Sequence, residues 1–400
     1  MKKALTLIML LLLAFAVLTS CGSSEKPSDK EGTQTEAPEE NKEFVPEIIP
    51  GSQINPRQFV IDYMYKMAQI KWTPSKDIDF TQGENEIAKN LYYTKGVEYQ
   101  GVIYVTGSRT MTNYEKFVAQ LNENGEYIGP ITKKEAWGSH CSSAIRLAYD
   151  KIEKGLTFDY TAEMVPSTKN GTIIVGDYKV EDSFKTTDEI IEANNATTMY
   201  EAYTKLQPGD CILTCWGPTG HARMVVELKI EKSGAGKVNP SRSGVYCIEQ
   251  TNSFDKDRKD GVKTTWYDRH FYSFADLYEA KYIPLTIKTL TETEFPDTEF
   301  TVKSFNSPET LTSGKLKGIV RSTYAKITSV TVDVQDKDGN VVATKEYENT
   351  NNDPLVFQFN NQAAPEGMDT LANGSYSCYI TANTLYGSAK IAKVDFTVGE

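Results

Sequence analysis

The sequence of 400 residues predicts an α+β protein in which a helix that bears a cysteine packs on an antiparallel sheet, followed by a β-sandwich. Two observations predict this. A Gly/Ser turn changes into a helical pattern at Cys141, and strand patterns over 211–215, 221–228 and 245–250 come later, separated by turns. After about residue 290 the pattern changes, and from residue 300 apolar residues alternate in period two.

The first 21 residues have the order of a secretory signal. A basic start over 1–3 precedes an apolar run over 4–17, which is shorter than the roughly 20 residues of a spanning helix. The stretch Leu18-Thr19-Ser20-Cys21 resembles the lipobox of bacterial lipoproteins. The resemblance implies a lipid on Cys21 and an extracytoplasmic protein anchored to the cell membrane. The alternative is an ordinary signal with a coincidental cysteine.

Residues 22–47 are rich in Ser, Glu, Lys, Pro and Thr, and we expect them to form a disordered tether. The chain has a net charge of −11, and its acidic residues are spread along the sequence. This charge argues against nucleic acid as a partner.

The remaining cysteines do not form the pattern of a disulfide scaffold. Five follow Cys21 at irregular spacing, so at least one thiol should stay free. Cys211 and Cys215 could suggest a zinc site, but no second pair follows them. We expect these two and Cys247 to be buried in strands, and we expect no metal and no cofactor.

Helical patterns surround the cysteine helix. The first covers 55–70, where Asn55-Pro56 is a natural cap and first-turn proline. The others are near 114–121, 187–193 and 198–205. In the cysteine helix the expected buried stripe is Ala144, Ile145, Ala148 and Tyr149.

The C-terminal part, residues 298–400, predicts an Ig-like β-sandwich. Roughly seven strands fit in about a hundred residues. Asp338-Gly339 and Asn373-Gly374 are expected hairpin turns. A module of this kind usually binds a partner or acts as a spacer, and its sequence contains no catalytic pattern.

Cys141 is the candidate nucleophile. It begins a helix, where unpaired amides and the helix dipole lower a thiol pKa. The base must be one of three histidines. His140 is a neighbour whose side chain should diverge from that of Cys141, and His270 has no geometric tie to it. His221 opens a strand after a glycine-containing loop, so we assign it the base role.

The imidazole also needs an acceptor that fixes its tautomer. Glu249, Gln250 and Asn252 on or beyond the next strand are candidates, and the sequence does not give the register. Glu249 and Gln250 point to opposite faces, so only one can orient His221. We favour Glu249 for that role and expect Gln250 to contact substrate.

The order of four short motifs is similar to that of the NlpC-type cell-wall peptidases, which are papain-like. The motifs are Gly101-Val-Ile-Tyr104, His140-Cys141-Ser142-Ser143, Pro208-Gly209-Asp210 and Gly220-His221. The resemblance implies a papain-like core over 48–290, with Cys141 as nucleophile, His221 as base and a polar orienting residue on the next strand. It also implies that Tyr104 lines the substrate cleft.

The sequence departs from the family pattern around the nucleophile. His140 stands where the family has an aspartate, and Ser143 stands where it has a glycine. Glu249 replaces the usual third histidine, and the spacing from Cys141 to His221 is longer than is typical. These departures indicate a divergent branch.

Two functions are compatible with these patterns. The first is a lipid-anchored cysteine hydrolase that cleaves amide bonds, with peptidoglycan stem peptides as the expected substrate. The second is a catalytically degenerate papain-like module that binds the cell wall or a partner. Replacement of Cys141 by Ala and the reactivity of its thiol distinguish them.

Overall fold

The computed structural model describes residues 44, 46–49, 55–81, 90–234, 236–292 and 298–399. The predicted signal over 1–21, with the lipidation residue Cys21, and nearly all of the predicted tether lie outside these residues. No helix among the described residues is long and apolar enough to cross a membrane.

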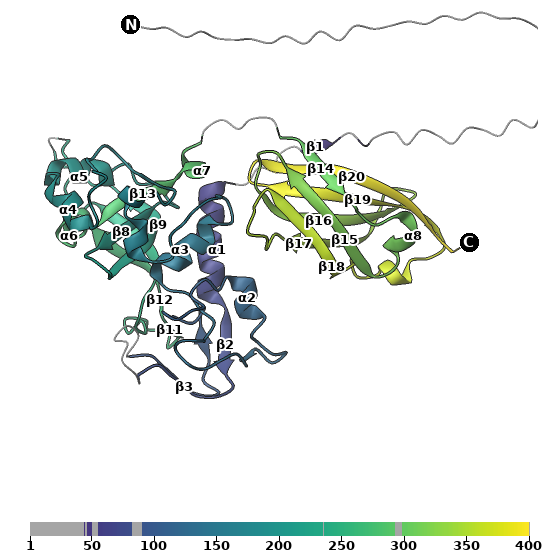
Figure 1. Cartoon of the computed structure of the whole chain (residues 1–400), viewed down its shortest axis with the longest axis horizontal. Coiled ribbons are helices and arrows are strands. Elements are labelled where there is room, and N and C mark those ends of the chain that lie inside the picture. Colours follow the sequence, from purple (N-terminus) through teal and green to yellow (C-terminus); the bar gives the residue numbers. More distant parts are fainter. Residues whose placement is uncertain are drawn as a thin grey trace, which may run out of the picture. The chain divides into compact units, whose positions relative to one another are not determined.

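The described chain is a mixed α+β structure with several sheets and few helices, as predicted (Figure 1). The buried apolar side chains form two clusters. One consists of residues between 60 and 290 together with Leu385, and the other consists of residues between 311 and 396. The change of sequence pattern near residue 290 therefore coincides with a change from one core to the other.

Helices make up the smaller share of the structure. They are α1(Pro56–Gln69), α2(Tyr114–Val118), α3(Cys141–Tyr149), α4(Thr187–Glu192), α5(Ala196–Tyr203), α6(Phe274–Glu279), α7(Lys288–Thr291) and α8(Pro308–Leu311), with short 3-10 helices η1(Thr161–Met164), η2(Pro166–Thr168) and η3(Met368–Thr370).

Helix α1 begins where its cap predicts. The Asn55 Oδ1 accepts from the amides of Arg57 at 3.0 Å and Gln58 at 3.4 Å, and Pro56 occupies the first turn. The Arg57 guanidinium donates to Asp210 Oδ1 at 2.8 Å and to the Pro208 carbonyl at 3.0 Å. Helix α1 thereby holds the Pro208-Gly209-Asp210 turn that leads into the main sheet.

The N-terminal part is built on a six-stranded sheet in which every neighbouring pair is antiparallel. Its strands in spatial order are β12(Trp266–Ser273), β10(Gly244–Gln250), β9(Gly220–Lys229), β8(Cys211–Cys215), β13(Ile283–Ile287) and β7(Thr172–Ile174). Helix α3 packs on β9 and β10 and beside α1 (Figure 1). The predicted arrangement of a cysteine helix on an antiparallel sheet is confirmed.

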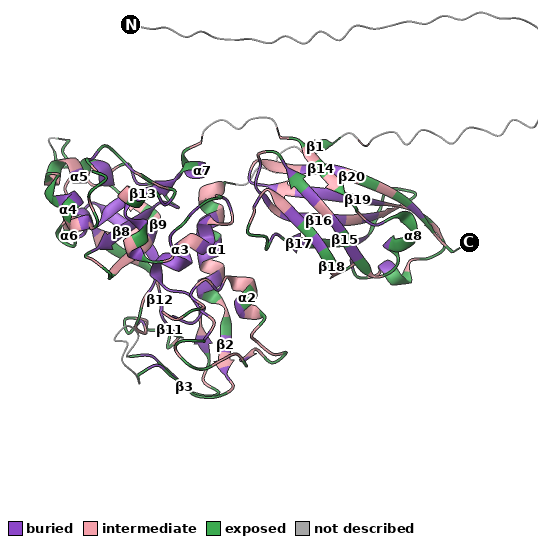
Figure 2. Cartoon of the chain, in the orientation of Figure 1, coloured by how far each residue is buried: buried purple, intermediate pink, exposed green. Residues whose placement is uncertain are grey.

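Burial follows this packing. All five residues of β8 and all five of β13 are buried, and so are eight of the nine residues of α3 (Figure 2). The predicted stripe of α3 is among them, because Ala144, Ile145, Ala148 and Tyr149 have no exposed surface. The helix that carries Cys141 is therefore fixed on both sides by core packing.

Smaller sheets hold the loops around this core. They consist of β11(Lys263–Thr264), β5(Tyr99–Gln100), β2(Lys71–Pro74) and β6(Glu126–Tyr127) in one, and of β3(Ile78–Asp79) and β4(Tyr92–Tyr93) in the other.

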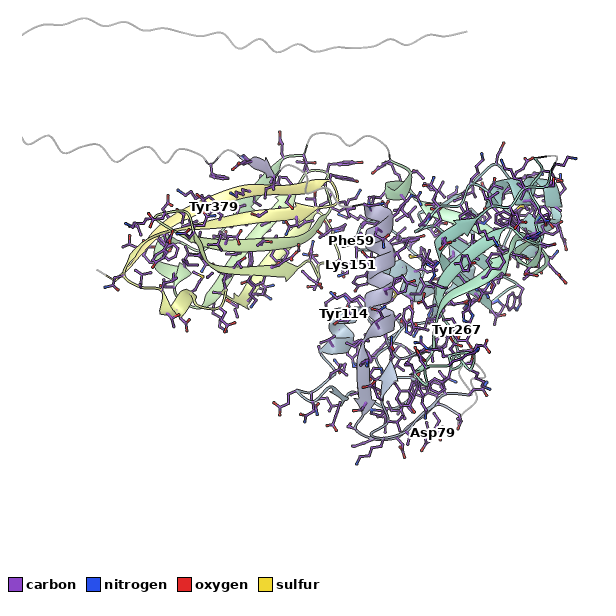
Figure 3. The ribbon with its side chains drawn as sticks, turned by 180° about the vertical axis from the view of Figure 1, so that it is seen from behind. Phe59, Asp79, Tyr114, Lys151, Tyr267 and Tyr379 are labelled. Atoms are coloured by element: carbon purple, nitrogen blue, oxygen red, sulfur yellow. The ribbon has the colours of Figure 1, made fainter. Side chains whose placement is uncertain are left out.

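Tyr114, labelled in Figure 3 beside α1, opens α2, and its amide donates to the Tyr63 hydroxyl at 3.2 Å. The Lys151 ammonium, also labelled there, lies 4.6 Å from the centre of the Tyr63 ring.

The backbone at Gly101 requires a glycine. Its φ is +88°, and a Cβ at this position would lie 2.2 Å from Trp266 Cδ1. The Gly101 carbonyl accepts from Trp72 Nε1 at 2.8 Å, and the next carbonyl, of Val102, accepts from Trp266 Nε1 at 3.1 Å. Two buried indoles thus fix the segment that leads to Tyr104.

The C-terminal part has two sheets. One contains β1(Glu47–Ile49), β20(Gly387–Val398), β19(Gly374–Thr384), β16(Ile327–Asp336) and β17(Val341–Glu348), and the other contains β14(Phe300–Lys303), β15(Lys315–Ser322) and β18(Val356–Ala363). Buried side chains of both sheets, such as Val320, Phe357, Val332 and Ile380, form the second core. Strand β1 precedes α1 in sequence but pairs with β20, a placement that the sequence pattern did not predict.

One of the two predicted hairpin turns in this part is wrong. Asp338-Gly339 joins β16 to β17 as predicted, with the Gly339 amide donating to the Asp336 carbonyl at 3.0 Å. Asn373-Gly374 does not close a hairpin, because β18 and β19 belong to different sheets and Gly374 opens β19.

Candidate active site

Cys141 is the first residue of α3, and His140 is its N-cap. The His140 amide donates to Ser143 Oγ at 2.9 Å, and His140 Nδ1 accepts from the Ser143 amide at 3.4 Å, which makes a reciprocal capping box. The first-turn amides of a helix have no acceptor within the helix. The thiol therefore sits at the positive end of the helix dipole, where a thiolate is favoured.

The sheet brings the predicted base and its acceptor together. A tight turn joins β8 to β9, with the Trp216 amide donating to the Thr219 carbonyl at 3.1 Å, and His221 follows at the start of β9. Glu249 lies on the neighbouring strand β10. His221 Nε2 and Glu249 Oε2 form a short hydrogen bond and ion pair.

Glu249 has two further donors. Arg223 Nε donates to Oε2 at 2.8 Å, and the Tyr272 hydroxyl donates to Oε1. Arg223 itself lies between two rings, 3.8 Å from the centre of Tyr272 and 4.5 Å from that of Tyr282. The Glu249 side chain is 1% exposed. This carboxylate is therefore buried, and its two oxygens are hydrogen-bonded to His221, Arg223 and Tyr272.

These contacts set the pKa of Glu249. Burial alone would raise its pKa, but the charge and hydrogen bond of His221, followed by Arg223 and Tyr272, lower it to about 2. The side chain is therefore a carboxylate at any pH near neutrality. It can hold the His221 ring in one orientation and stabilise its charged form.

The thiol and the imidazole shift each other in opposite directions. Burial of Cys141 opposes the thiolate, yet His221, chiefly through its charge, and His140 together hold the Cys141 pKa well below its ordinary value. Burial of His221 opposes its charged form, but the charges of Cys141 and Glu249 raise its pKa to about 9. These shifts favour a thiolate and an imidazolium over the neutral pair.

A cavity of about 690 Å³ opens onto this pair. Besides Cys141 and His221 it is lined by the capping residue His140, by Tyr104 and Thr106 from the segment after Gly101, and by aromatic side chains at its edge. Among those, Trp216 is 55% exposed and Tyr160 is 44% exposed. Tyr267, labelled in Figure 3, also lines it. Cys141, the candidate nucleophile, thus lines an open, partly aromatic cavity.

The other predicted site residues have different places. Tyr104 lines the cavity, and burial together with the nearby Cys141 charge raises its pKa well above the ordinary value. Gln250 is fully buried: its Oε1 accepts from Ser139 Oγ at 2.7 Å, and its Nε2 donates to the Val102 carbonyl at 2.8 Å. Among the described residues, Gln250 is not part of the cavity wall, so its expected contact with substrate has no support here.

The structure also shows where the other candidate residues lie that the sequence left open. Asn252 lines the cavity, but the candidate that is hydrogen-bonded to His221 is Glu249. His270 lies on β12 with its Nε2 3.6 Å from the Asp255 carboxylate, and it is not among the described residues that line the cavity. Sequence reasoning missed Arg223 and Tyr272. Arg223 follows His221 by two residues and so shares its face of the strand, which is a signal that the period of two could have revealed.

The remaining thiols are buried, and the described residues form no disulfide. Burial raises the pKa of Cys211 to about 12 and that of Cys247 well above its ordinary value. It also raises the pKa of Cys215, whose thiol contacts the Gly217 carbonyl at 3.2 Å. Within the described part of the chain, no cluster of three or more His, Cys, Asp or Glu side chains could hold a metal ion.

Comparison with protein-family models finds no match to the chain, and comparison with curated proteins finds none either.

Proposed function

We propose that the protein is a cysteine hydrolase that cleaves amide bonds, with a papain-like core of the NlpC type. The observation behind this proposal is the arrangement of Cys141 at a helix start, His221 on the facing strand and the buried Glu249 bound to it. Such an arrangement supports acyl transfer through a thioester.

The reaction follows from these groups. The Cys141 thiolate forms a bond to the substrate carbonyl carbon, and the carbonyl π electrons move to oxygen. When this intermediate collapses, the C–N bond breaks, and its electron pair leaves with the nitrogen, which takes the proton of the His221 imidazolium. Water then gives a proton to His221 and its oxygen to the thioester carbon, which releases the acid and returns the thiolate.

The substrate that we propose is the stem peptide of peptidoglycan. The lipobox-like Leu18-Thr19-Ser20-Cys21 and the polar segment after it would attach the enzyme to the cell membrane outside the cytoplasm and let it reach the wall. We interpret the C-terminal sheets as an Ig-like sandwich. This sandwich would bind a component of the envelope or act as a spacer there.

Hydrolysis by the Cys141→Ala variant tests the proposal. Wild-type protein incubated with purified peptidoglycan should release new amino groups, and the variant should release none, while its melting temperature stays close to that of the wild type. Cys215→Ala, which removes a buried thiol of the same core, is the matched control and should keep activity. Full activity in Cys141→Ala would contradict the proposal.

Thiol reactivity separates the hydrolase from a degenerate binding module. We expect iodoacetamide to label Cys141 alone at pH below neutrality, because its pKa is lowered, and we expect His221→Ala to abolish that fast labelling. The measurement is the rate of single-site alkylation against pH. A rate like that of a free thiol, unchanged by His221→Ala, would favour the binding module instead.

A further inference from the structure

The residue before the nucleophile has a polar atom with nothing to bond to. His140 is 4% exposed, and its Nε2 has no hydrogen-bond partner among the described residues. Buried side-chain polar atoms in proteins are nearly always paired, so each unpaired one calls for an explanation. The same is true of Thr106 Oγ1, and both residues line the cavity that contains Cys141.

The other ring nitrogen determines which one carries the proton. His140 Nδ1 faces the Ser143 amide at 3.4 Å and the Ser142 hydroxyl at 3.2 Å. An amide can only donate, so Nδ1 acts as the acceptor, and the proton of the neutral ring is on Nε2. The Ser142 hydroxyl, which also donates to the Asp159 carbonyl at 2.9 Å, can share its hydrogen with Nδ1. Nε2–H is therefore a buried donor without a partner among the described residues, on a side chain that lines the cavity.

The ring cannot turn easily away from this position. It stacks on Tyr160, with centroids 5.1 Å apart and planes 22° apart, and its Nδ1 is bound in the capping box. The backbone of His140 is extended, with φ −138° and ψ −179°, so its side chain is outside the helical geometry in which neighbours diverge.

We propose that His140 is a second catalytic histidine, whose Nε2–H donates a hydrogen bond to the oxyanion formed when Cys141 attacks a carbonyl. The inference rests on the proposed hydrolase function. The backbone amide of Cys141, in the first turn of α3, is the second donor to the same oxygen. No proton is transferred in this step; a preorganised donor of this type is worth about 10²–10³ in rate.

Two substitutions separate this role from that of a helix cap. His140→Asn keeps an acceptor near the position of Nδ1 and removes the distal donor. His140→Gln keeps a donor near the position of Nε2 and loses the cap acceptor. The cap role alone predicts that Gln is the more damaging change, whereas the donor role predicts that Asn is slower in catalysis although it is more stable.

The experiment compares acylation with alkylation in the full chain. Acylation is measured as the burst of nitrophenolate from 4-nitrophenyl acetate, whose leaving group needs no proton, at a pH where Cys141 is fully ionised. In alkylation by iodoacetamide at the same pH, the thiolate attacks a saturated carbon and no oxyanion forms. The alkylation rate therefore measures the reactivity of the thiolate independently of the proposed oxyanion donor.

For His140→Asn we expect acylation to fall by about 10²-fold and the limiting alkylation rate to stay within about threefold of wild type. His140→Gln should recover part of the acylation rate with a lower melting temperature. Equal losses in acylation and alkylation, or a faster Asn than Gln variant, would overturn the proposal.

Failure of this inference and failure of the hydrolase can be told apart. If wild type is acylated and His140→Asn is acylated equally fast, His140 is only a cap while the hydrolase proposal stands. If wild type is not acylated although Cys141 is alkylated rapidly, both are overturned.

Discussion

Glu249 shows how much of the site depends on one side chain. Its two oxygens receive hydrogen bonds from His221, Arg223 and Tyr272, and the group is buried. Removing it would leave the partly buried Arg223 charge beside two rings without a counter-charge, and breaking a buried ion pair typically costs about 3–5 kcal/mol. Glu249, which we expect to orient His221, therefore also contributes to the stability of the fold.

The protonation states of the pair predict a pH profile for hydrolysis of an amide substrate. Activity should rise below neutrality as Cys141 loses its proton, because its pKa is lowered. It should fall as pH passes through about 9, where His221 loses the proton that the leaving amine needs. The measurement is kcat/KM against pH. A profile that stays flat well above that pH would contradict the assignment of His221 as the acid.

At this scale the sequence predicted the residue types but not every contact. A thiol at a helix start and a histidine after a glycine loop led us to choose Cys141 and His221 from the five cysteines after Cys21 and the three histidines, and both line one cavity. The choice among Glu249, Gln250 and Asn252 depended on strand register, and β10 has a register shift against β9 that no local pattern reveals. Arg223 and Tyr272 become visible only once the strands are paired.

Among the elements, β10 has two successive residues with different contacts, one toward the cavity and one toward the core. Glu249 faces the cavity, whereas Gln250 points to the other side and joins Ser139, just before α3, to Val102, just after Gly101. One strand thus fixes the base and, through Gln250, the segments that carry Cys141 and Tyr104.

Gln250→Ala tests this structural role. The change removes two buried hydrogen bonds and leaves Ser139 Oγ without this partner, so we expect the free energy of unfolding to fall by about 2 kcal/mol or more. Urea denaturation measures it, and Gln58→Ala, an exposed glutamine, should change stability by less than about 0.5 kcal/mol. A raised KM with unchanged stability would instead support the substrate contact that the sequence suggested.

Elements whose signals are local were predicted well. The cap of α1, the start of α3 and the strands β8, β9 and β10 each follow from neighbouring residues. The errors concern pairing between distant segments. Strand β1 joins β20 across most of the chain, and Asn373-Gly374 has the composition of a hairpin turn but leads between two sheets.

At the scale of the whole molecule, the described residues form two hydrophobic cores, and we expect these cores to unfold separately. Leu213 belongs to the first core and Ile380 to the second, and both are fully buried. Truncation to Ala at either position should cost about 2–5 kcal/mol in its own core. Calorimetry of the full chain should show two transitions, with Leu213→Ala lowering one and Ile380→Ala the other. A single transition lowered by both variants would show that the cores unfold as one unit.

The change from one buried cluster to the other was predictable from the sequence because the period of the apolar pattern changes near residue 290. The pairing of β1 with β20 was not, since three residues between polar segments carry too short a pattern to indicate a strand.

The distribution of the thiols has a consequence for folding in an oxidising or a reducing environment. Disulfide exchange needs a thiolate that a partner can reach. Burial suppresses ionisation of Cys211, Cys215, Cys247 and Cys378 once the chain is folded, which leaves Cys141 as the described thiol that small oxidants can attack. Among the described residues no disulfide holds the fold, and we expect small oxidants to react at Cys141 before they reach the buried thiols of the core.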